Sequence, residues 1–554
     1  MVRVQLSNST HKSKSMLKLR LFLVAGLSVG IVSVNAQQPG QLDPTFGSGG
    51  KVITHIGGPI EGSDGSAIAV YPNGDFMVAG SHTTYDPSDT IEPYNKDILI
   101  VRYKPDGALD ITFGSNGIVT MDLGMGDEYI NAVALQTDGK VVLVGSAGVD
   151  PPGVDPDFDF LLLRLNTNGT PDISFGLNGI VIPPSSGSGH NWLHSVAVQP
   201  DGRIVIAGRL YNVSHWDFFI ARYLDDGMLD PTFGIVVADF PIFSGLGNDI
   251  ATSIAIAADG KLVVGGYTQK GGLSDFAVAR YNPDGSLDNT FGVGGMVTTD
   301  FNSKYERAFS LVIAPDGKIL LAGNVAKSGL GDSNVLGMAR YNPDGSLDAS
   351  FGNNGKVLAD FGNAPSTWSS LALQDTSRIV VAGTVQFNFS DFAVRRYLPT
   401  GVPDGSFGTN GIAITDLFER GDQASAIGIQ FDSKILAAGS SDKMPSGIGV
   451  SVARYYGHIT VGVPNQVGGL APAIYPNPAH ESVTLRYELT QPEAVTIRLL
   501  DLNGRLIHTF MEEKLQPTGG NTVLLDLPTG LMSGMYLLDI KSESASTVVK
   551  VVID

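Results

Sequence analysis

The chain of 554 residues contains no cysteine at all. This absence excludes disulfides, thiolate catalysis, cysteine-ligated zinc and a lipid-bearing N-terminal cysteine. Charged residues are also scarce, at 16%, and the 55 acidic residues outnumber the 36 basic ones, which gives a net charge of -19. Nucleic acids and anionic membrane surfaces both attract Lys and Arg, so we expect neither as a partner.

Long apolar runs are missing after the N-terminal segment, so we expect no transmembrane segment in the mature protein. The run 21–34 is apolar but shorter than the roughly 20 residues that a spanning helix needs. Basic residues precede it between Lys12 and Arg20, and Val34-Asn35-Ala36 supplies small residues where a signal peptidase cleaves. Residues 1–36 are therefore predicted to be a signal peptide, with Met1 and Met16 as alternative starts.

The chain is rich in glycine (69) and proline (30), and its apolar fraction of 43% is ample for a packed interior. This composition suits short strands joined by tight turns rather than disorder. A Phe-Gly pair after Leu-Asp or Pro-Asp also recurs at nearly constant spacing, which indicates a repeat architecture. The pairs begin at Phe46, Phe113, Phe175, Phe233, Phe291, Phe351 and Phe407.

One repeat, between Phe233 and Phe291, contains four strand-like segments and no helical period. These segments are 253–257, 261–265, 275–281 and 296–300. The first two are joined by Asp259-Gly260, a turn dipeptide that supplies the positive φ angles of a hairpin. Four strands in about 60 residues describe one blade of a propeller.

The two ends of the repeat region predict how the ring closes. The chain enters at Leu42 with the last part of a unit and leaves at Tyr455 just before that part would recur. We therefore predict an all-β fold with a seven-bladed β-propeller over residues 42–456, in which 51–55 pairs with the strand ending at Tyr455. An open stack of repeats is the alternative, although a stack is expected to carry atypical capping units.

The motifs LDxTFG, PDGKIVVAG and DFAVARYNPDGSLD, which recur in fixed order, resemble the delta-60 repeat, a bacterial extracellular repeat of propeller-like proteins. The resemblance covers about 42–455 and departs at Pro171 and Pro403, which replace Leu, and at Thr376-Ser377, which replaces Asp-Gly. The resemblance implies a propeller architecture. It implies no particular activity, because the family has no established common chemistry.

After a predicted linker at 457–472, residues 473–554 have a different pattern. Val483, Leu485, Tyr487 and Leu489 alternate along one of about six predicted strands, enough for a small β-sandwich. Several short motifs occur in this region, with the residues Pro476, Asn477, Pro478, Asp501, Gly504, Gly534, Tyr536 and Lys550. These motifs resemble the type A sorting domain of the type IX secretion system. By resemblance, the module directs a periplasmic protein across the outer membrane of a Bacteroidetes-type bacterium.

Seven arginines share one repeat phase, and a catalytic group is seldom needed seven times. We interpret them as hydrogen-bonding groups within or between blades; they are Arg102, Arg164, Arg222, Arg280, Arg340, Arg396 and Arg454. Asp155, Asp157 and Asp159 alternate as calcium ligands can, but the loop lacks the Gly and distal Glu of an EF-hand. We treat it as a solvated acidic loop and expect no metal and no cofactor.

Candidate ligand-binding residues lie in the loops between the second and third strand of each repeat, because function concentrates on variable loops held by a rigid scaffold. The longest such loops belong to the first two repeats, and they indicate Tyr85, Tyr94 and Asp155. Trp192, between His190 and His194, departs from the repeat and is either a surface aromatic contact or a packed side chain.

No nucleophile elbow, zincin motif or phosphate loop is present in the sequence, so we expect no catalytic residues. We predict an exported, non-enzymatic, monomeric binding or adhesion protein, delivered through the periplasm to the cell surface or the medium. Its expected partners are the type IX secretion machinery and an extracellular glycan or protein. The alternative is a propeller enzyme that acts on extracellular polysaccharide or peptide, because glycosidase chemistry needs only two carboxylates.

Overall fold

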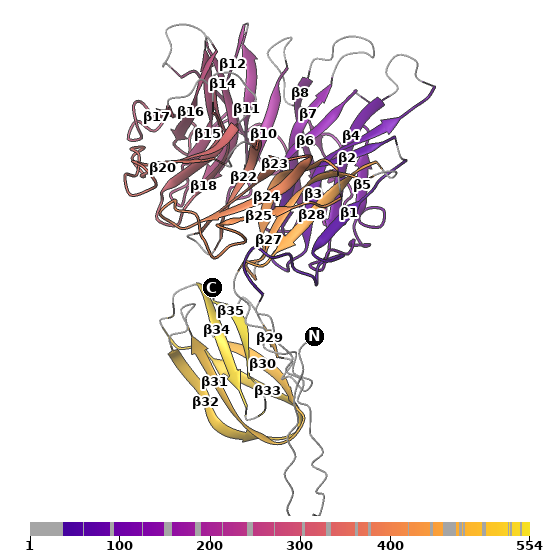
Figure 1. The fold of residues 1–554 in the computed structure, drawn as a ribbon, viewed down its shortest axis with the longest axis vertical. Coiled ribbons are helices and arrows are strands. Elements are labelled where there is room, and N and C mark those ends of the chain that lie inside the picture. Colours follow the sequence, from indigo (N-terminus) through magenta and orange to yellow (C-terminus); the bar gives the residue numbers. More distant parts are fainter. Residues whose placement is uncertain are drawn as a thin grey trace, which may run out of the picture. The chain divides into compact units, whose positions relative to one another are not determined.

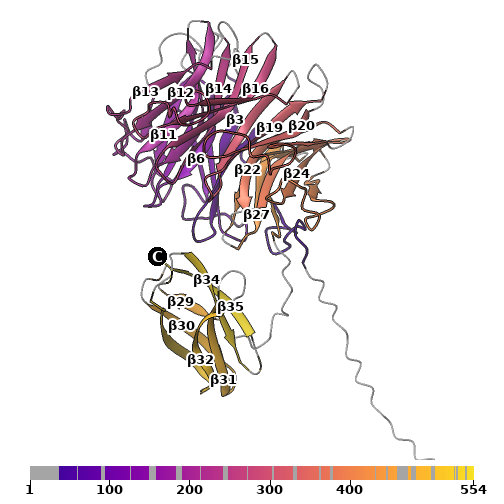
Figure 2. The same cartoon turned by 90° about the vertical axis from the view of Figure 1, so that its left-hand side faces the viewer.

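The computed structural model describes residues 37–553 with short gaps, and its two compact parts contain Gln37–Val461 and Gly462–Asp554 (Figures 1 and 2). The predicted signal peptide and residues 458–471 of the predicted linker lie outside the described residues. No helix in the described part of the chain is long and apolar enough to cross a bilayer. The gaps are 59, 89–93, 125, 149–157, 183–189, 213, 241–246, 271, 302–304, 328–333, 361–363, 375–377, 419, 431, 444–446, 458–471, 476–478, 480–481, 501–505, 530, 532–533, 543 and 545.

The first part contains, within the described residues, five four-stranded antiparallel sheets and one eight-stranded sheet, in which a parallel bridge between Gly62 and Ile448 joins two further four-stranded antiparallel units. These seven four-stranded units are here called blades 1 to 7. Blades 1 to 3 are β2 (Gly62–Val70), β3 (Phe76–Tyr85), β4 (Tyr94–Tyr103), β5 (Ile118–Met121); β6 (Glu128–Leu135), β7 (Val141–Gly148), β8 (Phe158–Leu165), β9 (Ile180–Val181); and β10 (Trp192–Val198), β11 (Ile204–Asn212), β12 (His215–Tyr223), β13 (Ile235–Ala238). Blades 4 to 6 are β14 (Asn248–Ile256), β15 (Leu262–Lys270), β16 (Leu273–Tyr281), β17 (Met296–Thr299); β18 (Glu306–Ile313), β19 (Ile319–Ala326), β20 (Asn334–Tyr341), β21 (Lys356–Ala359); and β22 (Ser366–Gln374), β23 (Arg378–Gln386), β24 (Ser390–Tyr397), β25 (Ile412–Thr415).

Blade 7 is built from both ends of the repeat region. Three of its strands are β26 (Asp422–Ile429), β27 (Ile435–Asp442) and β28 (Ile448–Tyr455), and the fourth is β1 (Lys51–Thr54). β1 pairs antiparallel with β28 in the register Lys51↔Ala453 to Thr54↔Val450, so the predicted pairing is confirmed. The first strands of the blades also pack on one another in the cyclic order β2, β6, β10, β14, β18, β22, β26 and back to β2, which closes the ring.

The cores lie between neighbouring blades because each strand presents apolar side chains on both faces. In β16, Phe276 and Val278 pack toward blade 5, whereas Ala277, Ala279 and Tyr281 pack toward blade 3. This is the division of faces that alternation along the strand predicts.

The turns show why particular glycines recur. In the hairpin between β14 and β15, only Gly260 has a positive φ, of 81°, while Asp259 accepts a hydrogen bond from the Lys261 amide. The expectation that both residues of Asp-Gly adopt positive φ is therefore wrong for this turn. Gly345 has a φ of 88°, and a Cβ there would lie 2.8 Å from the amide nitrogen of Gly292, so a side chain would separate blades 4 and 5.

The in-phase arginines stabilise the blades, as predicted. Arg396 donates to Asp404 (Nε to Oδ2, 2.9 Å), to Ser406 and, between repeats, to the Gly457 carbonyl. Its guanidinium also lies over the Phe407 ring, 4.8 Å from the centroid. Equivalent carboxylate pairs occur in all seven blades, and Arg454 of β28 reaches Asp43 from the N-terminal segment at 2.8 Å.

The second part contains two antiparallel sheets. Val483, Leu485, Tyr487 and Leu489 of β30 are buried in its core, as their alternation predicts. One sheet has the order β29 (Ala473–Tyr475), β30 (Ser482–Leu489), β33 (Gly519–Asp526), and the other β32 (Leu506–Gln516), β31 (Glu493–Leu500), β34 (Gly534–Lys541), β35 (Ser546–Ile553).

Candidate functional site

The ring has two chemically different rims. The turns between first and second strands and between third and fourth strands lie on one rim, here called the turn rim, which carries the arginine pairs. The connections between second and third strands, and from each fourth strand to the next blade, lie on the other, here called the loop rim. Of the candidate residues predicted from the sequence, Tyr85, Tyr94 and Trp192 lie in the described part of the chain and belong to the loop rim.

Tyr85 and Tyr94 face each other at the ends of β3 and β4. They are a register pair, their ring centroids lie 5.1 Å apart, and the Tyr94 side chain is 54% exposed. The structure therefore brings these two predicted residues together. Asp155, predicted beside them, lies outside the described residues.

The Trp192 side chain packs against other aromatic side chains. Its ring lies 5.4 Å from Tyr129 and 5.1 Å from Phe158, and the guanidinium of Arg209 lies between it and Trp216. The two predicted alternatives for Trp192 were a surface contact and a packed side chain, and the contacts favour packing. Burial lowers the pKa of the neighbouring His194 to about 3, so this histidine is neutral at physiological pH.

Two exposed aromatic residues were not predicted. Phe387 and Phe389 occupy the tight connection between β23 and β24, and their side chains are 59% and 57% exposed. Among the described residues, the large aromatic side chains that are this exposed are Phe387, Phe389 and Tyr94, and all three lie at second-to-third-strand connections. The available signal was the alternation Gln-Phe-Asn-Phe-Ser, but the short length of this loop directed attention elsewhere.

A polar pocket of 550 Å³ opens beside the Phe387–Phe389 connection. Gln386 and Ser390, which flank the two phenylalanines, both line it, together with residues of blades 5 and 7. The lining contains hydroxyl and amide side chains but no ionisable one. The lining residues are Asn334, Pro365, Ser366, Thr367, Ser369, Thr384, Gln386, Ser390, Gln423, Ala424 and Ser425.

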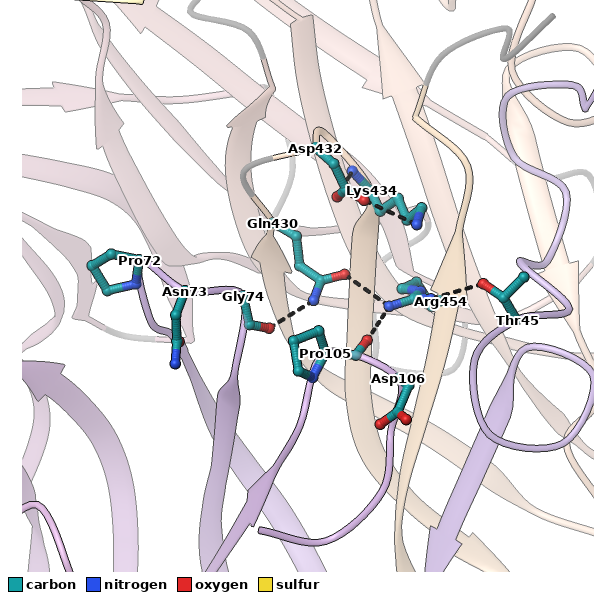
Figure 3. Close-up of a pocket in the computed structure, with 10 residues that line it drawn as sticks. All are labelled: Thr45, Pro72, Asn73, Gly74, Pro105, Asp106, Gln430, Asp432, Lys434 and Arg454. Carbon is teal, nitrogen blue, oxygen red and sulfur yellow. Dashed lines mark hydrogen bonds and ion pairs between the residues drawn. The ribbon is translucent and has the colours of Figure 1, made fainter. Parts of the chain in front are cut away.

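A second pocket, of 470 Å³, lies on the turn rim where the ring closes (Figure 3). Arg454 lines this pocket, and its guanidinium already donates to Thr45, Gln430 and the Pro105 carbonyl. Lys434 is likewise paired with Asp43 and Asp432. The charged groups of this pocket are engaged in closing the ring, so the loop rim is the better candidate for a ligand.

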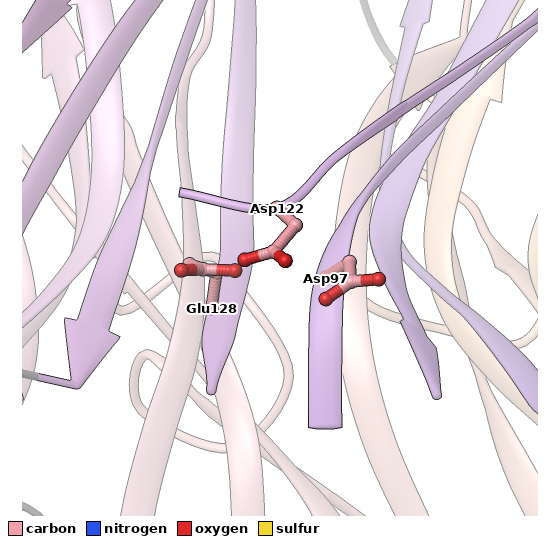
Figure 4. Close-up of side chains that lie close together, drawn as sticks. All are labelled: Asp97, Asp122 and Glu128. Carbon is pink, nitrogen blue, oxygen red and sulfur yellow. The ribbon is translucent and has the colours of Figure 1, made fainter. Parts of the chain in front are cut away.

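Carboxylates gather at four inter-blade junctions of the loop rim. At each, the three ligand atoms lie within 4.8 Å of one another, and Figure 4 shows one set, Asp97, Asp122 and Glu128, side by side. Each set takes one acid from a third strand, one from the end of a fourth strand and one from the first strand of the next blade. The other three sets are Asp217, Asp239, Asp249; Asp275, Asp300, Glu306; and Asp391, Asp416, Asp422.

Burial disfavours the ionised form of the third-strand aspartates of these sets and of Asp249 and Asp422. Burial, and then the charge of Asp239, raise the pKa of Asp249 to about 7. Burial and Asp416 likewise raise the pKa of Asp391 and of Asp422. The third-strand aspartates of these sets are not the partners of the in-phase arginines, which pair with other aspartates on the turn rim.

Few of the predicted sorting residues can be located. Pro476, Asn477, Pro478, Asp501 and Gly504 lie outside the described residues. Gly534 begins β34 and pairs with Ile553, and Tyr536 pairs with Val551 in the same ladder. Lys550 pairs with Leu537 through its backbone. β35 is an edge strand of the larger sheet of the second part, and β34 lies between β31 and β35.

Similar solved structures include PorZ, a bacterial surface component of the type-IX secretion system of Porphyromonas gingivalis, at 10% identity and a TM-score of 0.26, covering 88% of this chain and 81% of that one. The polysaccharide lyase Uly1 is similar at 14% identity and a TM-score of 0.41, covering 71% of this chain and 90% of that one. The α-L-arabinofuranosidase Arb93A from Fusarium graminearum is similar at 11% identity and a TM-score of 0.36, covering 58% of this chain and 91% of that one. No curated protein matches the chain.

Family models match both parts of the chain. The model described as a domain of unknown function (DUF5122) beta-propeller matches residues 136–175, 199–233, 257–291, 314–351 and 374–407. The model described as a secretion system C-terminal sorting domain matches residues 473–554. The sorting domain marks the protein for export to the cell surface or the medium and implies contact with the type IX secretion machinery. The chain is thus a secreted protein that joins DUF5122 β-propeller repeats to a C-terminal type IX sorting domain.

Proposed function

We propose that the propeller is a non-enzymatic binding module that holds an uncharged segment of an extracellular glycan on its loop rim. The observation that carries this proposal is the polar pocket beside two exposed phenylalanines. Carbohydrate sites combine hydroxyl and amide groups, which bond sugar hydroxyls, with an aromatic face that packs on the C–H groups of the ring.

The lining of the pocket supports this ligand class. Ser390, Gln386 and Gln423 offer donors and acceptors without a formal charge. An uncharged lining provides no electrostatic attraction for a sulfated or carboxylated sugar. Phe387 and Phe389, between Gln386 and Ser390, are positioned for stacking at the edge of the pocket.

The absence of ionisable groups from this lining supports binding rather than catalysis. General acid–base chemistry requires a titratable group within hydrogen-bond reach of the reacting atom. Tyr85 and Tyr94 belong to blade 1, which is the next blade in the ring after blade 7. These two tyrosines stay candidates for contacts with a longer ligand. A propeller enzyme that acts on polysaccharide or peptide is the competing function.

The test is binding of the exported protein to a glycan microarray, followed by titration of the best neutral oligosaccharide. Phe387→Ala with Phe389→Ala is expected to weaken binding roughly 5- to 150-fold, since each aromatic contact contributes about 0.5–1.5 kcal/mol. Gln423→Ala is expected to weaken it as well. The matched control is Leu177→Ala, because Leu177 is 78% exposed on the turn rim.

Unchanged affinity in the double phenylalanine variant would contradict the proposed site. Release of shortened oligosaccharides during the incubation would contradict the non-enzymatic function and favour the enzyme.

A further inference from the structure

The seven inter-blade junctions of the loop rim form an internal comparison. The junctions of blades 1/2, 3/4, 4/5 and 6/7 carry complete sets of three acids. At the junction of blades 5 and 6 the same positions are Val335, Asp360 and Ser366, and at that of blades 7 and 1 they are Gly449, His55 and Ser63. At these two junctions the third-strand acid and the first-strand acid are both missing, whereas the junction of blades 2 and 3 keeps the third-strand Asp159 and has Asn191 at the first-strand position.

The incomplete junctions balance the charge that they retain. Asp360 forms an ion pair with Lys327, with Nζ and Oδ2 2.6 Å apart. At the junction of blades 2 and 3, the amide of Asn191 donates to Asp159 at 3.3 Å. A lone carboxylate on this rim thus receives a lysine or an amide from the protein itself.

Two of the complete sets, at blades 3/4 and 6/7, each contain a buried carboxylate oxygen without a hydrogen bond of normal geometry. Asp249 and Asp422 are both 0% exposed, and Oδ2 of each accepts a backbone amide, from Phe240 (2.7 Å) and Leu417 (2.6 Å). The other oxygen, Oδ1, is buried in each residue and accepts no hydrogen bond of normal geometry, although the side chains of Thr268 and Ser441 lie close enough to lower the pKa of Asp249 and of Asp422 respectively. Neither residue forms an ion pair with a described lysine or arginine. Burying an unpaired carboxylate oxygen is costly, and a bound cation offsets that cost.

We propose that these four carboxylate sets bind divalent cations of the Ca²⁺ type between neighbouring blades. Calcium takes six to eight oxygen ligands at about 2.3–2.6 Å, so oxygens on one ion lie no more than about 5 Å apart. The separation of the ligand atoms, within 4.8 Å, fits that limit. An all-carboxylate set without histidine or cysteine suits a hard cation better than zinc or copper.

The sets at blades 3/4 and 6/7 carry this proposal furthest, because they contain the buried Oδ1 atoms of Asp249 and Asp422, which accept no hydrogen bond of normal geometry. In the former, His215 lies 3.1 Å from Oδ1 of Asp217 and competes for one acid when it is protonated. A cation would join a third strand and a fourth-strand end to the next first strand. The bound cation would therefore cross-link neighbouring blades at the rim that carries the proposed glycan site. The proposal requires only that the protein is exported, because calcium is abundant outside the cell.

The experiment is calorimetric titration of the full chain, first freed of metal with EDTA, with CaCl₂ alone. We expect up to four ions per chain with dissociation constants of roughly 10⁻⁴–10⁻³ M, the range of extracellular modules. The variants Asp249→Asn and Asp422→Asn keep the side-chain size and remove the charge. Each is expected to lower the number of bound ions by one, and each is expected to keep its fold in EDTA because carboxylate repulsion is relieved.

The matched control is Asp360→Asn, which removes the same charge at the repeat phase of Asp239 and Asp416 but in a set with one acid, and it is expected to leave the number of ions unchanged. Phe387→Ala is likewise expected to leave it unchanged, which separates this proposal from the proposed glycan site. No heat and no rise in Tm with CaCl₂ up to about 10 mM, well above the expected range, would overturn the proposal. Unchanged stoichiometry in both Asn variants would overturn it as well, and would mean that protons rather than cations neutralise the buried acids.

Discussion

Phe46→Ala is expected to loosen the ring at its closing strand more than anywhere else. Phe46 is fully buried, belongs to the N-terminal segment, and packs between blade 7 and blade 1 against residues such as Phe76 and Val452. The Arg454 guanidinium also lies 4.6 Å from its ring centroid. Truncation of a buried phenylalanine to alanine costs about 3–5 kcal/mol. If β1 opens locally, its amides should then exchange with solvent roughly 10²- to 10⁴-fold faster.

Hydrogen exchange followed by mass spectrometry measures this effect on peptides that cover β1. The matched variant is Phe291→Ala, because Phe291 is equally buried at the same repeat phase but between blades 4 and 5. Its loss is expected to lower Tm while β1 stays protected. The idea that β1 opens separately from the rest of the ring would be refuted by either of two results. One is that the β1 amides exchange equally fast in both variants, and the other is that they stay protected from exchange in Phe46→Ala.

Two further predictions concern acid stability and export. Burial opposes ionisation of Asp348, but hydrogen bonds from Ser350 and the charges of Arg340 and Lys318 hold its pKa at about 2. A group whose pKa is lower in the folded state stabilises the fold above its pKa in the unfolded chain, and this stabilisation is lost as pH falls from about 4 to 2. The urea midpoint of unfolding should therefore fall more steeply over this interval for the parent protein than for Asp348→Asn. Parallel curves of midpoint against pH would contradict this assignment. Deletion of residues 473–554 is expected to leave the propeller in the periplasm, as cell fractionation and immunoblotting would report, and normal amounts in the medium would contradict the sorting role.

The repeat and its closure could be predicted because they depend on local chemistry. Turn residues, strand alternation and the phase of Phe46 and Tyr455 are all legible along the chain, and the structure confirms the pairing of β1 with β28. The role of the arginines was predictable for the same reason, since a group that recurs at one phase has a recurring environment.

The candidate site was less predictable because its members come from different blades. Asp217 and Asp239 belong to one repeat, and Asp249 opens the next, so their proximity depends on how two blades pack. The Asp/Glu exchange at the first-strand position further conceals the pattern. Phe387 was missed for another reason: loop length says where insertions occur, whereas exposure depends on the absence of a covering neighbour, which a single sequence does not encode.

The strand that completes blade 7 from the other end of the repeats has a consequence for the order of folding. β1 and β28 lie about 400 residues apart, whereas neighbouring blades are separated by about 60. Because the entropy of closing a loop grows as the logarithm of its length, this last pairing costs roughly 1.5–2 kcal/mol more than docking consecutive blades. Blades should therefore assemble progressively, with the N-terminal segment docking last. Until then blade 7 has three strands and an open edge, and a newly translocated chain is exposed to mispairing with a second copy during that interval.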